Sequence, residues 1–523
     1  MKKAWKTLIS TSLIIYYPAF ADSLPKPNSF LANEILAITH VDPAATDSYP
    51  YTIPQGTFHI DLNNTPQVVG GPVNIMTLAS TSHNYMWGVS SGGVTYIDKS
   101  GNHWKEAARI SIPGVKAVTA KLNQDALGHV FQSEQDVEHS VKNIYQMVGF
   151  DRISNGVYSL VNKDNILYAN YNKYFIYSFA LKDSNDPTAG IKILHSMNFN
   201  KIPNKKVQEG ITGLSMTYDG NIIVTGNRSL TIVDPNLEKV LARIEFNKNE
   251  YVSNSVSVDE NNGIYVASDK IMRKVVWTGH QLSMNEKDGA WSSPYETGDQ
   301  PPVVKVGTGT GSTPTLMGFG NKDKLVVITD GANRMHLVAF WRDEIPKNFK
   351  QQTGTQSRRI AGQIPVTCGF EKLPKFIQSE QSVVVKDYGA FVVNNIGTKG
   401  NKDLLVGVIA LGPIYPPAKG VERFEWDTEK HQWHSVWANS AVVSTSMVPV
   451  VSIPSNIVLI NGYTQKEGWE ITGLDWNTGN IVHHTLFGQN NYGNGAYALI
   501  ELSQNNTMIF NSIAGPYRID YSH

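Results

Sequence analysis

The sequence predicts an all-β protein folded as a β-propeller, and three observations support this prediction. Short strand patterns recur along the chain, polar turns separate them, and the third strand of almost every repeat ends in Asp or Asn. Because one small sheet cannot bury its own apolar faces, the repeated sheets must pack against one another. A closed ring of such sheets is typical of a β-propeller.

The clearest repeat is the segment Gly311–Asp343. It predicts three strands, at Ser312–Phe319, Leu325–Thr329 and His336–Trp341, with polar turns between them. Each strand is short and apolar, as expected for a sheet that is covered on both faces. We therefore use this segment as the reference for the other repeats.

Similar third strands mark the other repeats. The carboxyl or amide of a closing Asp or Asn can bond the backbone two residues on, which starts the turn into an outer strand. One repeat, Asn254–Trp277, has the strands but lacks this closing residue. With the reference repeat they predict eight blades, with seven as the alternative. The other closing marks are Val94–Asp98, Phe179–Asp183, Leu230–Asp234, Arg423–Asp427, Leu474–Asn477 and Tyr517–Asp520.

The two ends of the repeat region predict how the ring closes. The last repeat, Asn494–Tyr521, has only three strand patterns, and two unassigned patterns, Gly56–Leu62 and Pro66–Val69, precede the first repeat. Pairing an N-terminal strand with the last blade would remove a free sheet edge. We therefore expect Gly56–Leu62 to complete the sheet of the last repeat.

Two insertions interrupt the repeats. Gln135–Val148 has apolar residues on one helical face and predicts a helix, whereas Gly397–Gly420 is rich in Gly and Pro. The tetrapeptide Gln132–Gln135 returns as Gln378–Gln381, which suggests a duplicated half. Matching insertion lengths could equally arise by chance.

The N-terminus predicts export. Residues 1–21 combine early lysines, a short apolar run and a small-x-small ending at Ala21, the pattern of a cleaved signal peptide; an uncleaved anchor is the alternative. No later segment is apolar enough to span a membrane. We expect an extended arm over 22–51, a single propeller domain over 52–523, and a periplasmic or secreted protein.

Composition limits the partners. Lys plus Arg equals Asp plus Glu at 45 each, so no net charge favours nucleic acid. The single cysteine, Cys368, excludes an intramolecular disulfide. We expect a monomer whose partner is a small molecule or an envelope protein.

Candidate ligand-binding residues come from the starts of the inner strands, which converge on the central channel of a propeller. Small and hydroxylated side chains there also suit crowded strands, and a solvated loop position explains any single carboxylate. Oxygen ligands such as Glu209 and Asn254 suit calcium, and the paired arginines could clamp an anion. The candidates are Glu134, Glu209, Asn254, Thr313, Glu380, Arg358 and Arg359.

Known catalytic motifs give little guidance. The glycine-rich run Gly307–Gly311 precedes a strand instead of opening a helix, so it lacks the geometry of a dinucleotide loop. No H-E-x-x-H zinc motif is present. The catalytic residues stay unassigned.

Two segments resemble known propeller groups. Leu474–Asn480 resembles the D-x-x-T-G turn of quinoprotein-like propellers, the eight-bladed fold of pyrroloquinoline-quinone alcohol dehydrogenases. Glu209-Gly210, followed by Tyr218–Val224, is similar to strands of gluconolactonase-like propellers, in which Glu, Asn and Asp hold calcium. The first resemblance implies a propeller fold. The adjacent cysteine pair of those dehydrogenases cannot form here, because the chain has a single cysteine. The second implies a possible calcium site at Glu209 and Asn254.

These observations lead to one main functional hypothesis and two alternatives. The main hypothesis is an exported propeller that binds a small molecule or a protein at its central channel. The alternatives are a metal-assisted hydrolase or lactonase and a quinone-dependent oxidoreductase. Whether the protein is an enzyme is left open.

Overall fold

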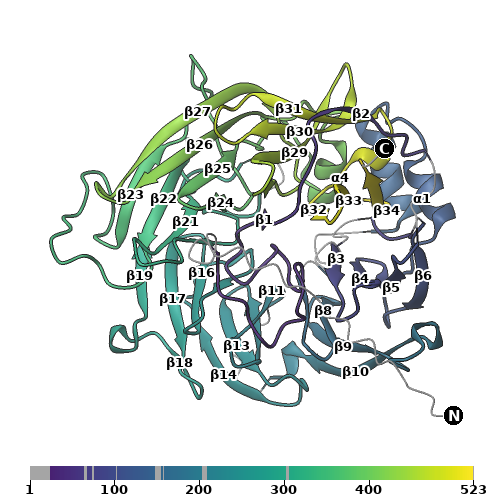
Figure 1. The fold of residues 1–523 in the computed structure, drawn as a ribbon, viewed down its shortest axis with the longest axis horizontal. Helices are drawn as coiled ribbons and strands as arrows, with labels where there is room; N and C mark the ends of the chain where they lie inside the picture. The colour runs from purple at the N-terminus through teal and green to yellow at the C-terminus, as the bar shows by residue number, and fades with distance from the viewer. Residues whose placement is uncertain are drawn as a thin grey trace, which may run out of the picture.

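A computed structural model describes residues 24–63, 68–72, 76–101, 103–147, 155–156, 158–202, 209–301 and 305–521. The expected signal peptide, residues 1–21, lies outside these ranges. The described strands form sheets arranged in a ring around a central axis (Figure 1). The predicted fold class, an all-β propeller, is therefore confirmed.

The first four sheets follow in chain order, each beginning with its inner strand. The first consists of β3 (Met76–Ala79), β4 (Tyr85–Ser90), β5 (Gly93–Asp98) and β6 (Lys105–Ile110). The second consists of β7 (Ser159–Val161), β8 (Leu167–Tyr171), β9 (Phe175–Leu181) and β10 (Ile191–Asn198). The third consists of β11 (Ile211–Met216), β12 (Ile222–Gly226), β13 (Ser229–Val233) and β14 (Val240–Glu245). The fourth consists of β15 (Ser257–Val258), β16 (Gly263–Ala267), β17 (Ile271–Trp277), β18 (Leu282–Ser283) and β19 (Trp291–Pro294).

The remaining sheets continue around the ring. The fifth consists of β20 (Thr315–Met317), β21 (Leu325–Thr329), β22 (His336–Trp341) and β23 (Ile360–Pro365). The sixth consists of β24 (Val384–Lys386), β25 (Gly389–Val393), β26 (Lys419–Asp427) and β27 (Gln432–Val443). The seventh consists of β28 (Val450–Ser452), β29 (Ile457–Thr464), β30 (Gly468–Asp475) and β31 (Ile481–Gly488), with β1 (Ser48–Tyr49) and β2 (Gly56–His59) at its two edges. The eighth consists of β32 (Ile500–Ser503), β33 (Thr507–Ser512) and β34 (Gly515–Asp520).

Seven sheets contain at least four strands, which gives the seven blades of the alternative prediction. The eighth sheet contains three strands, and counting it as a blade gives eight. The sequence repeats map one to one onto all eight sheets, with a third strand at or beside each closing mark. Within the reference repeat, the boundaries of β21 and β22 agree with prediction, and the inner strand β20 is shorter than predicted.

The predicted closure is wrong in its partner. β2 pairs in parallel with β31, with Gly56 opposite His483, so it extends the outer edge of the seventh sheet and not the eighth. The described residues of the N-terminal segment reach the eighth sheet through side chains and single backbone bonds. The ring of Phe58 lies 4.6 Å from that of Tyr521, and Gly70 N–H donates to Ala514 O at 3.1 Å. Within 66–69, only Val68 and Val69 are described, and they form no strand.

A buried carboxyl group joins the eighth sheet to the first. Glu501 Oε1, on β32, accepts from the backbone N–H of Thr77 on β3 at 3.1 Å, and its Oε2 contacts the Thr77 hydroxyl. Asn511 Nδ2, on β33, donates to Oε1 at 2.7 Å. Burial raises the pKa of Glu501 to about 7, against the opposing effect of these hydrogen bonds. Hydrogen bonds to this carboxyl group thus join the two sheets at the seam where the ring closes.

The N-terminal arm follows the inner strands of the ring, and β1 lies near the centre in Figure 1. Its carbonyl groups accept from inner-strand N–H groups that no neighbouring strand of the same sheet would satisfy. The bonds run from successive arm residues to successive sheets. They are Val258 N–H to Pro43 O (2.7 Å), Leu316 N–H to Ala44 O (2.9 Å), Val385 N–H to Thr46 O (3.1 Å) and Val451 N–H to Asp47 O (3.0 Å).

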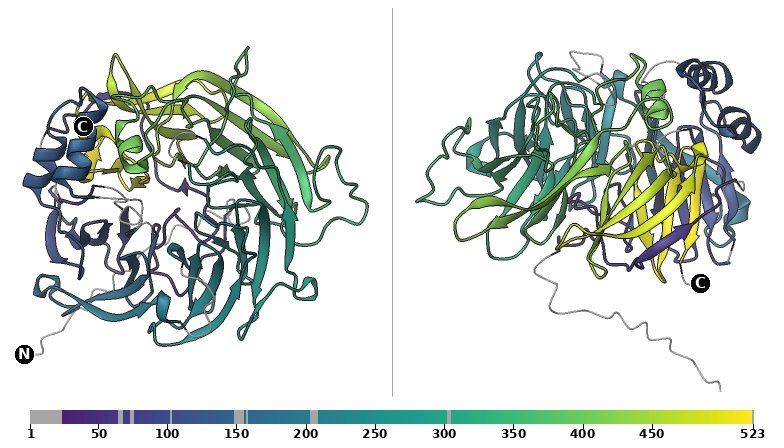
Figure 2. Two further views of the ribbon diagram at one scale, coloured as in Figure 1. Left: turned by 180° about the vertical axis from the view of Figure 1, so that it is seen from behind. Right: turned by 90° about the horizontal axis from the view of Figure 1, so that it is seen from above.

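The longer helices lie on one face of the ring (Figure 2). The predicted helix begins at Glu134, where Ser133 caps it, and continues as a π-helix over His139–Ile144; Val148 lies outside the described residues. Sequence analysis missed α1 (Ala120–Leu127) and α4 (Leu404–Ala410). Within the described ranges, no helix has both the length and the hydrophobicity needed to cross a bilayer. Short 3₁₀ turns occupy Pro187–Ala189, Phe199–Lys201, Glu286–Asp288 and Asn491–Gly493.

Candidate functional site at the channel mouth

The segments that lead into the inner strands meet at one end of the central channel, which we call the channel mouth. Two of the predicted residues touch there. Thr313 Oγ1, before β20, donates to Asn254 Oδ1 at 3.0 Å, and Asn254 Nδ2 donates to Gly311 O at 2.7 Å. Tyr158 reaches Thr313 from the second sheet, with 3.4 Å between their hydroxyl oxygens. These contacts link the second, fourth and fifth sheets across the channel.

Glu380 lies at this mouth, on the segment that leads into β24 and close to Tyr158. Its side chain is partly exposed, yet burial raises its pKa well above the usual range of a carboxyl group. This combination is expected when the exposed surface faces a confined channel instead of bulk water. Gln381 Nε2 and Asn395 Nδ2 both donate to its Oε1 at 3.3 Å. Glu380 is therefore positioned to exchange hydrogen bonds with a ligand while it is uncharged.

Tyr497, on the segment before β32, lies near Glu380 at the channel mouth. Its side chain is partly exposed, and burial, followed by the nearby charge of Glu380, raises the pKa of its phenol. Its backbone has a positive φ of 58°, a conformation that aromatic residues rarely adopt. Such outliers persist where the surrounding structure holds them, and they concentrate at functional sites.

Lys305 adds a buried cation. Its side chain is 1% exposed, and Nζ has no hydrogen-bond partner among the described residues. Burial lowers the pKa of its ammonium group to about 8, and the charges of Asp330 and Glu380 oppose that effect. Neither carboxylate lies within ion-pair distance of Nζ in the described part of the chain. An unpaired buried ammonium is costly, so the site favours an oxygen-rich or anionic ligand.

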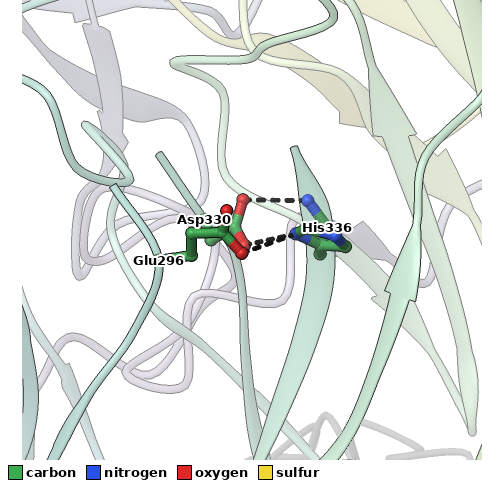
Figure 3. Close-up of side chains that lie close together, drawn as sticks. All are labelled: Glu296, Asp330 and His336. Atoms are coloured by element: carbon green, nitrogen blue, oxygen red, sulfur yellow. Dashed lines mark hydrogen bonds and ion pairs between the residues drawn. The ribbon is translucent and has the colours of Figure 1, made fainter. Parts of the chain in front are cut away.

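Asp330 and His336, on either side of the turn between β21 and β22 of the fifth sheet, form an acid–histidine cluster with Glu296 (Figure 3). His336 Nδ1 is 2.7 Å from Asp330 Oδ2 and 3.9 Å from Glu296 Oε2. Asp330 Oδ1 also accepts from the backbone N–H of His336 at 2.8 Å. The bond from Asp330 raises the pKa of His336 although burial alone would lower it. Ligand atoms of the three side chains lie within 4.8 Å of one another, so the cluster could hold a metal ion.

Glu209 and Glu134 have protein partners elsewhere. Glu209 Oε1 accepts from Arg243 Nη2 at 2.5 Å and from the Ser229 hydroxyl at 2.5 Å, while Oε2 accepts from Arg228 N–H at 2.7 Å. Glu134 contacts the amide of Asn401, so it ties α2 (Glu134–Glu138) to the segment before α4. Among the described residues, the partners of Glu209 do not include Asn254, and their joint metal site stays a prediction.

The two arginines support a loop. Arg358 donates to the carbonyls of Phe349 (3.0 Å) and Pro346 (3.2 Å). Arg359 donates to Trp341 O at 3.1 Å and lies 5.1 Å from the centre of the Trp291 ring. Both guanidinium groups therefore bond backbone carbonyls of the connection between β22 and β23, a structural role that suffices to explain them.

Sequence reasoning missed several residues of the channel mouth. Lys305 follows a Pro-rich apolar run, and nothing in that run distinguishes a buried lysine from a solvated one. Tyr158 and Tyr497 resemble ordinary packing aromatics in the sequence. Asp330 and His336 lie six residues apart across a turn, and this spacing in the sequence is a signal that the two side chains could meet.

Comparisons with known proteins support the fold. No family model matches the chain. An uncharacterised protein of Archaeoglobus fulgidus is 36% identical over 328 residues; the match spans 60% of this chain and 61% of that protein. The quinohemoprotein alcohol dehydrogenase of Comamonas testosteroni is 12% identical, with a TM-score of 0.50 over 93% of this chain and 77% of that one. A europium-containing methanol dehydrogenase is 10% identical, with a TM-score of 0.49 over 91% and 89%. The resemblance to quinoprotein-like propellers is thus confirmed for the fold.

The residues present do not fit the quinone site that this resemblance implies. Cys368 is the single cysteine of the chain, and it is buried. The adjacent cysteine pair of those enzymes therefore cannot form.

Proposed function

We propose that the protein is an exported propeller that binds a small, oxygen-rich molecule at its channel mouth. One observation carries the proposal. Three partly exposed polar side chains, Asn254, Glu380 and Tyr497, lie on the segments that lead into the inner strands of three different sheets. Convergent polar groups in a confined space are the usual mark of a ligand site.

The side chains also indicate the ligand's chemistry. An uncharged carboxyl group at Glu380 both donates and accepts hydrogen bonds, as the amide of Asn254 does, whereas the phenol of Tyr497 can donate. The buried ammonium of Lys305 adds positive potential behind them. A hydroxylated molecule with a carbonyl or carboxylate group, such as a sugar or a sugar acid, matches this set.

Isothermal titration with glucose and with gluconate tests the proposal. We expect saturable binding of at least one of them, and Glu380→Ala should weaken it about tenfold, since the hydrogen bonds of the carboxyl group are lost. Glu371→Ala, at an exposed position, is the matched control. Equal binding by both variants, or no binding by either sugar, would contradict the proposal.

A second candidate function, metal-assisted hydrolysis, is favoured by the cluster of Glu296, Asp330 and His336. One imidazole and two carboxylates suit a divalent transition metal. Elemental analysis should then find about one bound metal per chain in the wild type and none in Asp330→Asn. The same preparations test calcium at Glu209 and Asn254, because a chelator should lower the melting temperature if calcium binds. A metal-free protein that ignores chelators would refute both sites.

The proposed export rests on residues 1–21. Expressed in a Gram-negative host, the protein should be recovered from the periplasm with Asp22 at its N-terminus. Recovery from the cytosol with Met1 intact would contradict export without affecting the channel-mouth proposal.

A further inference from the structure

A cavity lies on the face opposite the channel mouth. It is a cleft of about 1070 Å³ between the N-terminal arm and the turns of the first and eighth sheets, and we call it the arm-face cleft. Its first-sheet lining includes Lys99 and Trp104, and its eighth-sheet lining includes Gln504 and Arg518. Its size is that of a site for a ligand of ordinary small-molecule size.

One wall of the cleft is positively charged. Lys99 is half-buried, and burial lowers the pKa of its ammonium group although the charge of Glu501 opposes this. Arg518 Nη1 donates to the carbonyl of Gly101 at 3.0 Å. Gly101 follows Lys99 by two residues, so the guanidinium group lies against the turn that carries Lys99. The two cations therefore belong to the same wall.

Lys99 differs from the other cations that line the cleft. Lys26 lies 3.6 Å from Glu260, Arg518 lies 3.3 Å from Asp520, and His83 contacts Glu34. For Lys99, the described residues offer no carboxylate within ion-pair distance. A half-buried cation without an ionic partner favours an anion from solution.

The opposite wall is apolar. The arm contributes the side chains of Leu31, Ile35, Ile38 and Val41 to the lining. The carboxyl group of Asp42 also lines the cleft, but burial raises its pKa to about 7, and the hydroxyl of Thr46 bonds it. Glu34, whose partner is His83, is the other acid of this lining.

We propose that the arm-face cleft binds an amphipathic organic anion. Its charged end lies at Lys99 and Arg518, and its apolar body lies against Leu31, Ile35 and Ile38. This site is separate from the channel mouth, because the inner strands begin at one face of the ring and the turns around His83 and Ser503–Asn505 lie at the other. The shared chemistry is an acidic head on an apolar body, which either an acyl chain or an aromatic ring could supply.

Two probes distinguish these sources: dodecanoate for an acyl chain and 1-anilinonaphthalene-8-sulfonate for an aromatic body. Titrations of the full mature chain should saturate at one molecule per chain for at least one probe, and added salt should weaken binding. Lys99→Gln should raise the dissociation constant about tenfold, since it removes the charged hydrogen bond. The control Lys322→Gln changes an exposed lysine on the same face that does not line the cleft.

A second variant tests the apolar wall. Ile35→Ser should weaken binding several-fold, because Ile35 is partly buried and lines the cleft. Unchanged melting temperatures would show that both variants fold. Binding that ignores Lys99→Gln and Ile35→Ser, or failure of both probes to saturate below millimolar concentration, would overturn the proposal. Sugar binding at the channel mouth should be unaffected by Lys99→Gln, which separates this test from that of the proposed function.

Discussion

The seam between the first and eighth sheets makes a quantitative prediction about pH. Glu501 is 1% exposed, and its pKa is raised from 4.5 to about 7. Because the folded pKa lies above the unfolded one, the folded state holds a proton that the unfolded state loses between these two pH values. The contribution of Glu501 to stability is therefore full below pH 4.5 and is lost as pH rises to about 7.

The shift sets the size of the effect. About 2.5 pKa units correspond to about 3 kcal/mol at 1.36 kcal/mol per unit. Glu501→Gln cannot ionise, and its amide can still accept from Thr77 N–H and from Asn511 Nδ2. The difference in unfolding free energy between the variant and the wild type should therefore move by about 3 kcal/mol from pH 4 to pH 8, in favour of the variant.

Urea unfolding at a series of pH values measures this difference, at conditions where unfolding and refolding curves coincide. Glu429→Gln, at an exposed position, should leave the pH profile unchanged. Glu501→Ala should instead destabilise the protein at every pH by roughly 3 kcal/mol, because Thr77 and Asn511 lose their acceptor. If Glu501→Gln shows the wild-type pH profile, the carboxyl group is not buried at the seam as described.

Two further predictions concern the fifth sheet and the arm. Asp330 raises the pKa of His336, so the ion pair stabilises the fold below pH 6.5, and its contribution fades as pH rises through the folded pKa. The loss of unfolding free energy caused by His336→Gln, measured by urea unfolding, should therefore be larger at pH 5.5 than at pH 8.5. An equal loss at both pH values would contradict the ion pair. Removing residues 22–55 deletes the acceptors of four inner-strand N–H groups, at about 1 kcal/mol each. The melting temperature should fall and the transition should broaden. A truncated chain that melts as sharply and as late as the mature one would show that the arm does not hold the ring.

The sequence predicts the blades better than it predicts how they join. Third strands such as β5 and β34 carry a local signal, because the closing Asp or Asn must start a turn. The partner of β2 carries no such signal: its four residues would fit the outer edge of either the seventh or the eighth sheet. Edge choice depends on where the arm leaves the centre of the ring, which is a property of the assembled fold.

The channel mouth shows the same division between local and assembled information. Asn254, Thr313 and Glu380 could be identified because they begin inner strands, and all three lie near the mouth. Glu209 begins an inner strand as well, but its neighbour Arg243 comes from the outer strand of the same sheet and neutralises it. Only the packed sheet reveals that partner, so a carboxylate at a favourable position is not yet a ligand site.

The arm connects the two candidate sites physically. His40 bonds Asp47 at 3.0 Å within the arm, and its ring lies 6.0 Å from that of Tyr158, which reaches Thr313 at the channel mouth. The same arm supplies the apolar wall of the arm-face cleft through Ile35 and Ile38. Because one segment forms a boundary of both spaces, substitutions that displace it should disturb both kinds of binding. Substitutions of Lys99 or Glu380, which lie outside the arm on connections of the first and sixth sheets, should disturb only one.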